Sequence, residues 1–319
     1  MARYGTFKHQ GIPLKLDDGC YGEQFFVDGT NGNDGNVGTV PGKAFKTIQY
    51  ALDKQIENAT GLGDKINVFP GTYAETLAGD LSKVSIVGSG VTPNAVLIQP
   101  TDGNAFSGAM VDSAMRNMTF YSPDTSNTTY AAVRVDAMTG SVIDSCHFYA
   151  GAVSATSTAF RRGTEAGDDT WTYMERSAFT NNLIGIRGAG KNFYFGIVFG
   201  LSSIAGTGSQ QRVFQNSLIA HNTICAESYG ILLNVNSNSG NGGLIYRNNV
   251  GGGALSKAEC GYQGIQSVGH SGDNALMKVV ENYVAAAGDA IKGFQASNVF
   301  GNYVSVGRAT PTRENPAGA

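Results

Sequence analysis

The chain has 319 residues, a formal net charge of −3 and 44 glycines. Only 15% of the residues are charged, so the chain has no basic field that would hold nucleic acid. Apolar residues make up 41% of the chain and recur along its length, which excludes a disordered protein. Few charges combined with many glycine, asparagine, serine and threonine residues favour a β-rich chain with many turns.

The N-terminal residues 1–24 are polar and poorly periodic, and we expect them to form an arm rather than a domain. They contain no continuous apolar segment of the kind that secretory signal peptides carry. The chain also has no apolar run of about 18 residues, so we expect no membrane insertion. These features predict a protein that is made in a cytoplasm and stays soluble.

The cysteines are widely separated and form no Cys-x-x-Cys pair, which removes the usual spacing of metal and redox sites. Buried thiols are favoured over disulfides. We therefore expect no cofactor and no metal site. The cysteines are Cys20, Cys146, Cys225 and Cys260.

The first expected element is a short apolar strand at 25–27, followed by a loop rich in glycine and asparagine at 28–36. The only convincing helix follows at about 46–58. Its predicted apolar stripe is formed by Ile48, Leu52 and Ile56, with Thr47 as N-cap. A single amphipathic helix ahead of many strands is expected to cover the open end of a strand stack.

Downstream of the helix, short apolar segments alternate with turn residues. Strands are expected at 66–69, 84–87 and 95–98, and each ends at a glycine or a proline. A weak unit then repeats, in which polar or small residues precede an apolar anchor. The anchors are Phe120, Phe148, Phe179, Ile219, Val250, Val284 and Val304.

The irregular spacing of these anchors argues against propellers and leucine-rich repeats, and it fits coils of short strands joined by loops of variable length. Segments after several anchors are expected to form the next face of each coil; they are 131–135, 184–186, 230–233 and 290–293. Asparagines beside four anchors are expected to stack as amide ladders and to supply the left-handed backbone of tight corners. They are Asn216, Asn248, Asn282 and Asn302.

The segments 26–35, 45–49 and 66–75 place a strand, a glycine loop, a helix and the run Ile-Asn-Val-Phe-Pro-Gly-Thr-Tyr in that order. This arrangement resembles the N-terminal end of parallel β-helix proteins of the pectate-lyase-like superfamily. The resemblance implies an all-β, right-handed, single-stranded parallel β-helix with an N-terminal capping α-helix. It would span 25–305, followed by a polar C-terminal tail at 306–319.

The opening residues 3–7 resemble the short starts of some phage tail and virion proteins. Phage spikes commonly use this fold as trimers, so the resemblance implies a virion protein made in the host cytoplasm. It would be a non-catalytic tail spike or fibre adhesin, or a head decoration protein. Residues 1–24 would attach it to other virion proteins, it would form a homotrimer, and it would bind host surface polysaccharide.

The same superfamily includes lyases and hydrolases of acidic polysaccharides, so the alternative is a polysaccharide depolymerase. Asp28 and Asp34 lack the acidic spacing of a Ca²⁺ loop and are interpreted as turn residues. The segments 269–273 and 288–292 contain only fragments of a hydrolase pattern, because no Asn-Thr-Asp or Arg-Ile-Lys run occurs.

One segment, 161–176, concentrates arginines, acids and aromatic residues, including the only tryptophan. Its residues are interpreted first as a subunit interface, then as a glycan-binding surface, and last as a catalytic site. Alternation along a strand would place the last three of the binding candidates on one face. These candidates are Arg161, Arg162, Trp171, Tyr173 and Glu175.

If the protein is an enzyme, acids of the same segment would serve as general acid, general base or nucleophile. These candidate catalytic residues are Glu165, Asp168, Asp169 and Glu175. The histidines His147 and His221 lie in or next to repeat units, and we expect them to be packed or solvated rather than catalytic.

Overall fold

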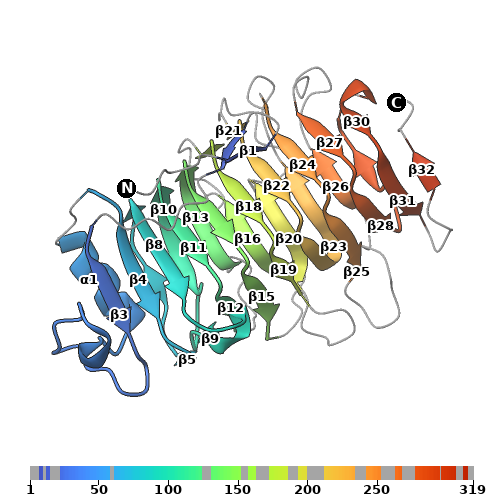
Figure 1. Ribbon diagram of the computed structural model, residues 1–319. Coiled ribbons are helices and arrows are strands. Elements are labelled where there is room, and N and C mark those ends of the chain that lie inside the picture. The colour runs from blue at the N-terminus through green and yellow to red at the C-terminus, as the bar shows by residue number, and fades with distance from the viewer. Residues whose placement is uncertain are drawn as a thin grey trace.

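The computed structural model shows a parallel β-helix, in which the chain winds in successive coils and each strand pairs in parallel with strands of the neighbouring coils (Figure 1). The predicted fold class, a right-handed single-stranded parallel β-helix with an N-terminal capping helix, is confirmed. The structure describes residues 7–9, 12–14, 22–57, 61–123, 131–151, 157–162, 172–185, 193–199, 212–233, 242–252, 263–267, 277–294, 296–306 and 312–314.

Three strand ladders, here called faces 1, 2 and 3, form the walls of the coil. Face 1 is a separate sheet of ten strands. At a layer spacing of about 4.8 Å, ten layers make a rod of about 43 Å. The strands of face 1 are β3 (Gln24–Val27), β4 (Asp64–Val68), β8 (Val84–Gly88), β11 (Ala114–Arg116), β14 (Val142–Asp144), β18 (Ala178–Thr180), β22 (Leu218–Ala220), β24 (Leu244–Tyr246), β27 (Lys278–Val280) and β30 (Val299–Phe300).

Face 2 follows face 1 along the chain within each coil and runs along the lower side of the rod in Figure 1. Its strands are β5 (Gly71–Tyr73), β9 (Val96–Ile98), β12 (Thr119–Ser122), β15 (His147–Ala150), β19 (Leu183–Ile184), the first half of β23 (Thr223–Leu233), β25 (Asn249–Gly252), β28 (Tyr283–Ala286) and β31 (Asn302–Val306).

Face 3 closes each coil, and the long strand β23 joins it to face 2 in one hydrogen-bonded sheet. Its strands are β6 (Leu77–Ala78), β7 (Leu81–Ser82), β10 (Phe106–Val111), β13 (Ala131–Thr139), β16 (Thr158–Arg162), β17 (Thr172–Glu175), β20 (Phe193–Phe199), β21 (Arg212–Gln215), the second half of β23, β26 (Gln263–Ser267) and β29 (Ile291–Lys292).

Elements outside the coils are short. Strands β1 (Phe7–His9) and β2 (Ile12–Leu14) pair antiparallel, and β32 (Thr312–Glu314) pairs antiparallel with β31. Short 3₁₀ helices lie at Pro41–Lys43, Pro93–Ala95 and Ala296–Asn298. No helix in the described part of the chain is long and apolar enough to cross a membrane.

Helix α1 (Ile48–Glu57) packs against β3, β4 and β6 and covers the N-terminal end of the core, as the sequence predicts (Figure 1). The N-cap prediction is confirmed, because the Tyr50 N–H donates to the Thr47 hydroxyl at 3.3 Å. The stripe prediction is wrong at Ile56, which is 47% exposed, whereas Gln55 is buried. The helical period turns Ile56, eight residues after Ile48, away from the core and aligns Gln55 with Ile48 instead. Gln55 Nε2 donates to Asp64 Oδ2 at 3.1 Å.

The carboxylate of Glu75 caps the N-terminus of α1. Glu75 accepts hydrogen bonds from the backbone N–H groups of Ile48 and Gln49, at 2.9 and 2.8 Å. Burial raises the pKa of Glu75, and the two N–H donors oppose that rise. A side chain from the coil that the helix covers therefore fixes the start of that helix.

The core consists of inward-facing side chains that repeat from coil to coil. On face 2, register places Phe120 opposite Phe148, and their rings stack with centroids 5.5 Å apart. The series continues through Ile184, Ile224, Val250, Val284 and Val304, all of them buried. Because apolar side chains stack on apolar side chains at equivalent positions, successive coils have similar cross-sections and pack closely on one another.

The predicted repeat frame is corrected in the middle of the chain. Phe120, Phe148 and Val250 lie on face 2, whereas Phe179 and Ile219 lie on face 1, in β18 and β22. The face 2 partners in those coils are instead Ile184 and Ile224. Both turns beside face 1 carry a polar pair followed by an apolar strand, so the sequence pattern does not distinguish them.

The predicted asparagine ladder exists at the turn between faces 1 and 2, here called the asparagine turn. The Oδ1 of every member after Asn182 accepts the backbone N–H of the asparagine one coil earlier, at 2.8 to 3.1 Å. Asn248, Asn282 and Asn302 belong to it as predicted, but Asn216 does not. The members of the ladder are Asn182, Asn222, Asn248, Asn282 and Asn302.

Asn216 lies at the other turn, between faces 3 and 1, here called the serine turn. It is exposed and has a φ of 47°. Stacking and left-handed backbone are predicted for the same asparagines, whereas the structure assigns them to different residues. The residue before each ladder asparagine takes the left-handed conformation, as at Arg247 (φ 51°) and Glu281 (φ 53°).

Candidate functional site

The segment that the sequence singles out is described only in part. Arg161 is buried in β16, 5% exposed, and lies opposite Arg134 in register. Arg162 and Tyr173 are placed as strand residues, while their side chains lie outside the described part. The remaining candidates outside the described residues are Glu165, Asp168, Asp169 and Trp171.

Glu175 is the one candidate acid that the structure describes. It ends β17, and its Oε1 lies 3.4 Å from Nε of Arg176, with both side chains partly exposed. The described residues therefore bring no pair of carboxylates together in this segment. The predictions for its other residues stay predictions.

The glycine loop at 28–36 is a turn, as predicted. Asp28 Oδ1 accepts the backbone N–H groups of Thr30 and Asn31, at 2.9 and 3.0 Å. The hydrogen bond from Asn31 lowers the pKa of Asp28. Within the described ranges, no group of three or more histidine, cysteine, aspartate or glutamate side chains is placed to hold a metal ion.

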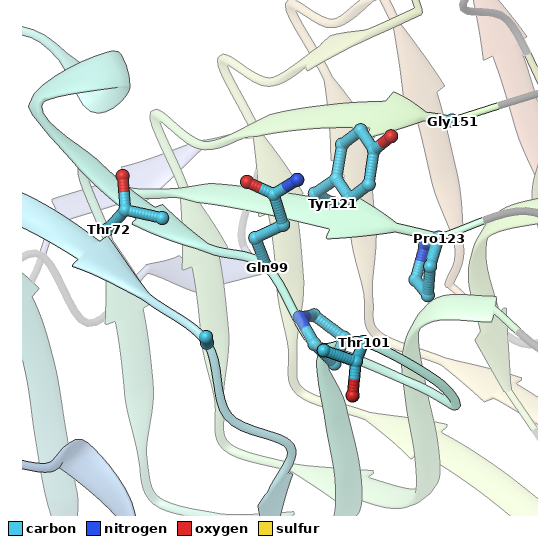
Figure 2. Close-up of a pocket in the computed structure, with 8 residues that line it drawn as sticks. Thr72, Gln99, Thr101, Tyr121, Pro123 and Gly151 are labelled. Carbon is cyan, nitrogen blue, oxygen red and sulfur yellow. The ribbon is translucent and has the colours of Figure 1, made fainter.

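A pocket of about 480 Å³ lies instead on the outer side of face 2, over β5, β9 and β12. Strand alternation turns Tyr73 and Phe120 into the core, and it turns their neighbours Thr72 and Tyr121 outward. Figure 2 shows Gln99 standing beside the Tyr121 ring on the next coil. The pocket is lined by Thr72, Ala74, Gln99, Pro100, Thr101, Tyr121, Pro123 and Gly151.

A polar cluster adjoins this pocket on the following coil. Tyr149 lies opposite Tyr121 in register, and its hydroxyl is 3.0 Å from Nδ1 of His147. The same Nδ1 is 2.8 Å from Asn94 Oδ1, which also accepts the Thr119 hydroxyl at 3.1 Å. Asn94 belongs to the 3₁₀ helix Pro93–Ala95, which precedes β9.

Partial burial sets the protonation of this cluster. Desolvation lowers the pKa of His147 and raises the pKa of Tyr149. At neutral pH the imidazole is therefore neutral and the phenol keeps its proton. With its hydrogen on Nδ1, His147 donates to Asn94 Oδ1, and its Nε2 is a hydrogen-bond acceptor.

Together the pocket and the cluster offer aromatic surface, hydroxyls, amides and a neutral imidazole. Aromatic rings pack on the apolar side of a ligand, and the polar groups fix its orientation. No carboxylate is among the residues that line the pocket. The arrangement suits recognition of a polyhydroxylated ligand better than hydrolysis by two acids.

No motif in the sequence led us to this site. His147 is predicted to be packed or solvated rather than catalytic, and its half-buried side chain lies in a defined hydrogen-bond cluster. A signal was present, because two apolar anchors are each followed by a tyrosine that alternation turns outward, Tyr121 and Tyr149. Gln99 and Asn94 carried no comparable signal, since only the register of the coils brings them beside these tyrosines.

No family model matches the chain, and no curated protein matches its sequence. Solved structures match it by fold. A GH136 lacto-N-biosidase from Eubacterium ramulus has a TM-score of 0.53 at 11% identity, over 88% of this chain and 56% of its own. A pectin methylesterase from carrot has a TM-score of 0.50 at 14% identity, over 92% of this chain and 86% of its own.

At these identities the likeness establishes the fold alone. Both proteins are carbohydrate-active enzymes with parallel β-helix folds, so the comparison agrees with the predicted fold. Neither is a phage tail spike or another virion protein. The chain spans 56% of the length of the lacto-N-biosidase that it matches.

Proposed function

We propose that this protein binds carbohydrate on the outer side of face 2, at the pocket lined by Gln99 and Tyr121. One observation carries the proposal: an outward tyrosine, an amide and a neutral imidazole cluster converge beside a pocket of about 480 Å³. Sugars present apolar ring faces and many hydroxyls, and this set of groups complements both.

Support also comes from the scaffold, on which two structural neighbours are carbohydrate-active enzymes. A stiff rod holds its outward side chains at a fixed spacing, so little conformational entropy is lost when a ligand binds. The proposal needs no residue of the segment 161–176.

The test is binding of the purified protein to an immobilised panel of polysaccharides, followed by titration calorimetry with the best ligand. Tyr121→Ala is expected to weaken binding about tenfold, because the ring loses its contact with the sugar. The matched control is Tyr194→Ala, a half-buried tyrosine on face 3. Binding to no glycan, or an equal loss in both variants, contradicts the proposal.

A second candidate function is depolymerisation of the bound polysaccharide. The observation that favours it is the 3.0 Å contact between the Tyr149 hydroxyl and His147 Nδ1. Because Nδ1 carries the imidazole hydrogen, the hydroxyl accepts there and keeps its own hydrogen for a ligand, while His147 Nε2 is able to accept a proton from a ligand hydroxyl. Release of reducing ends or unsaturated products from the panel tests it. Loss of product in His147→Ala assigns the chemistry to this pair, whereas loss in Glu165→Gln or Asp169→Asn assigns it to the acids predicted from sequence.

A virion location, attachment through residues 1–24 and a homotrimer remain separate proposals that rest on the sequence resemblance. Mass spectrometry of purified phage particles and the solution mass of the isolated protein test them. A monomer in solution contradicts the trimer.

A further inference from the structure

A second pair of aromatic side chains lies far along the rod from the pocket. Tyr283 in β28 and Tyr303 in β31 are opposite each other in register, and they are 42% and 48% exposed. Their neighbours along the strands, Val284 and Val304, are buried in the core. The two rings therefore stand on the outer side of face 2, on adjacent coils.

This tyrosine pair lies on the same line of outward positions as the His147 cluster. Register connects His147 to Leu183, Thr223, Asn249 and Tyr283 in successive coils. Four layers separate His147 from Tyr283, which is about 19 Å at the usual strand spacing. A disaccharide is too short to reach both, whereas a chain of several sugar units lying along the rod reaches both.

The positions between the two aromatic groups suit such a chain. Thr223 and Asn249 are exposed and present a hydroxyl and an amide. None of the described residues on this line or on the line beside it carries a charge at neutral pH. These residues are Thr72, Leu97, Thr119, His147, Leu183, Thr223, Asn249, Tyr283 and Tyr303 on the first line, and Gln99, Tyr121, Tyr149, Gly185, Cys225, Gly251, Ala285 and Ser305 on the second.

An acidic polysaccharide would place a row of carboxylates over this surface. Recognition of such a row depends on arginine or lysine side chains, and burying carboxylates against uncharged groups costs free energy. The described residues of these two lines offer no such partner, and the arginine at the bordering turn, Arg247, is already paired with Glu281 at 2.8 Å. Hydroxyls and amides suit uncharged sugars.

We infer that the ligand is an uncharged polysaccharide bound lengthwise along the outer side of face 2, with the pocket and the Tyr283–Tyr303 pair as two subsites of one surface. The inference rests on the proposed carbohydrate binding at the pocket. It adds the charge class of the ligand, its length and a second contact region.

The test is calorimetry with two series of oligosaccharides of increasing length, one of neutral gluco-, galacto- and manno-oligosaccharides and one of oligogalacturonates. Wild-type affinity is expected to rise steeply once a neutral oligomer is long enough to reach both subsites. The double variant Tyr283→Ala/Tyr303→Ala is expected to lose about tenfold in affinity for the long neutral oligomers and to bind the short ones unchanged.

The matched control is Phe300→Ala, which removes an aromatic side chain of the same exposure, 42%, from face 1. An affinity independent of length, a double variant equal to wild type, or tighter binding of oligogalacturonates overturns the inference while leaving binding at the pocket intact. Binding to neither series, or Tyr121→Ala equal to wild type, overturns the proposed function itself.

Discussion

The two turns that flank face 1 share a backbone and differ in their side-chain chemistry. At the serine turn, Arg176 (φ 51°) precedes buried Ser177; at the asparagine turn, Arg247 (φ 51°) precedes buried Asn248. In both, the buried side chain accepts a backbone N–H from the coil before it. The Ser177 hydroxyl donates its hydrogen bond to the Glu175 carbonyl, two residues earlier in the chain. The Asn248 amide instead donates to Asn282 on the next coil.

The two turns therefore supply hydrogen bonds to their buried polar groups in different ways. The Ser177 hydroxyl has one hydrogen to donate and uses it within its own coil. The amide has two, so it donates to a core carbonyl and to the next asparagine, and the chain of amides links coil to coil. We expect the asparagine turn to contribute more to stability than the serine turn.

The largest expected effect is at the centre of the asparagine ladder. Asn222→Ala removes the acceptor of the Asn182 N–H and the donor to the Phe179 carbonyl, at 2.9 and 3.0 Å. We expect a loss of about 3 to 5 kcal/mol in the free energy of unfolding, because buried polar groups lose their partners. Urea denaturation measures it, and the exposed Asn249→Ala should change stability by less than about 0.5 kcal/mol.

The matching change at the serine turn is expected to cost less. Ser177→Ala leaves the Ser141 N–H without its acceptor at 3.1 Å, while the Glu175 carbonyl loses one donor. We expect a loss of about 1 to 2 kcal/mol, again from urea denaturation. Equal losses in Ser177→Ala and Asn222→Ala would refute the distinction between the two turns.

Cys146 extends the comparison, because it occupies the asparagine position one coil before Asn182. Its Sγ lies 3.7 Å from the Met115 carbonyl, the place that an asparagine amide takes in later coils, and its thiol accepts a hydrogen bond from the Met118 backbone. Burial raises the pKa of this thiol to about 12, so it stays protonated.

Replacing this thiol with an amide should therefore extend the ladder. We expect Cys146→Asn to raise the melting temperature, by the equivalent of about 1 kcal/mol, because an amide makes stronger hydrogen bonds than a thiol. Cys146→Val, which makes none, should lower it. A fall in both variants would mean that the site accepts no polar side chain larger than a thiol.

The smallest expected effect concerns what the two turns share. Arg176 and Glu281 both have left-handed backbone, with φ of 51° and 53°. Glycine at either position removes a steric penalty but adds freedom to the unfolded chain, so we expect a gain of about 0.5 kcal/mol in each variant. A similar small rise in melting temperature at both turns would confirm that their backbones are equivalent.

The comparison also explains how far sequence analysis could go. The first strand, the loop at 28–36, the capping helix and the β-helix itself follow from local patterns, and the structure confirms them. The frame of the repeat does not, because Ser177 and Asn248 stand in the same local pattern at different turns. The choice between them depends on which coil lies above and below, and loops of unequal length hide that from the sequence.

The candidate site follows the same rule. Alternation along a strand, a local property, determines that Tyr121 and Tyr149 point outward. Stacking of coils determines that Gln99 stands beside Tyr121 and that Asn94 meets His147, since these pairs are distant in sequence. The segment 161–176 was selected as a candidate site because of its composition, and composition does not determine which side chains lie close together in the fold.

By itself, the sequence of this protein determined the kind of structure: short strands, tight turns and one helix that closes a stack. These features depend on backbone preferences and on the period of apolar residues, which neighbours along the chain decide. The tertiary structure alone decided which asparagines form the ladder and which side chains share the outer side of face 2. Those contacts depend on the register between coils, and that register is set by packing across the whole layer rather than by any single segment.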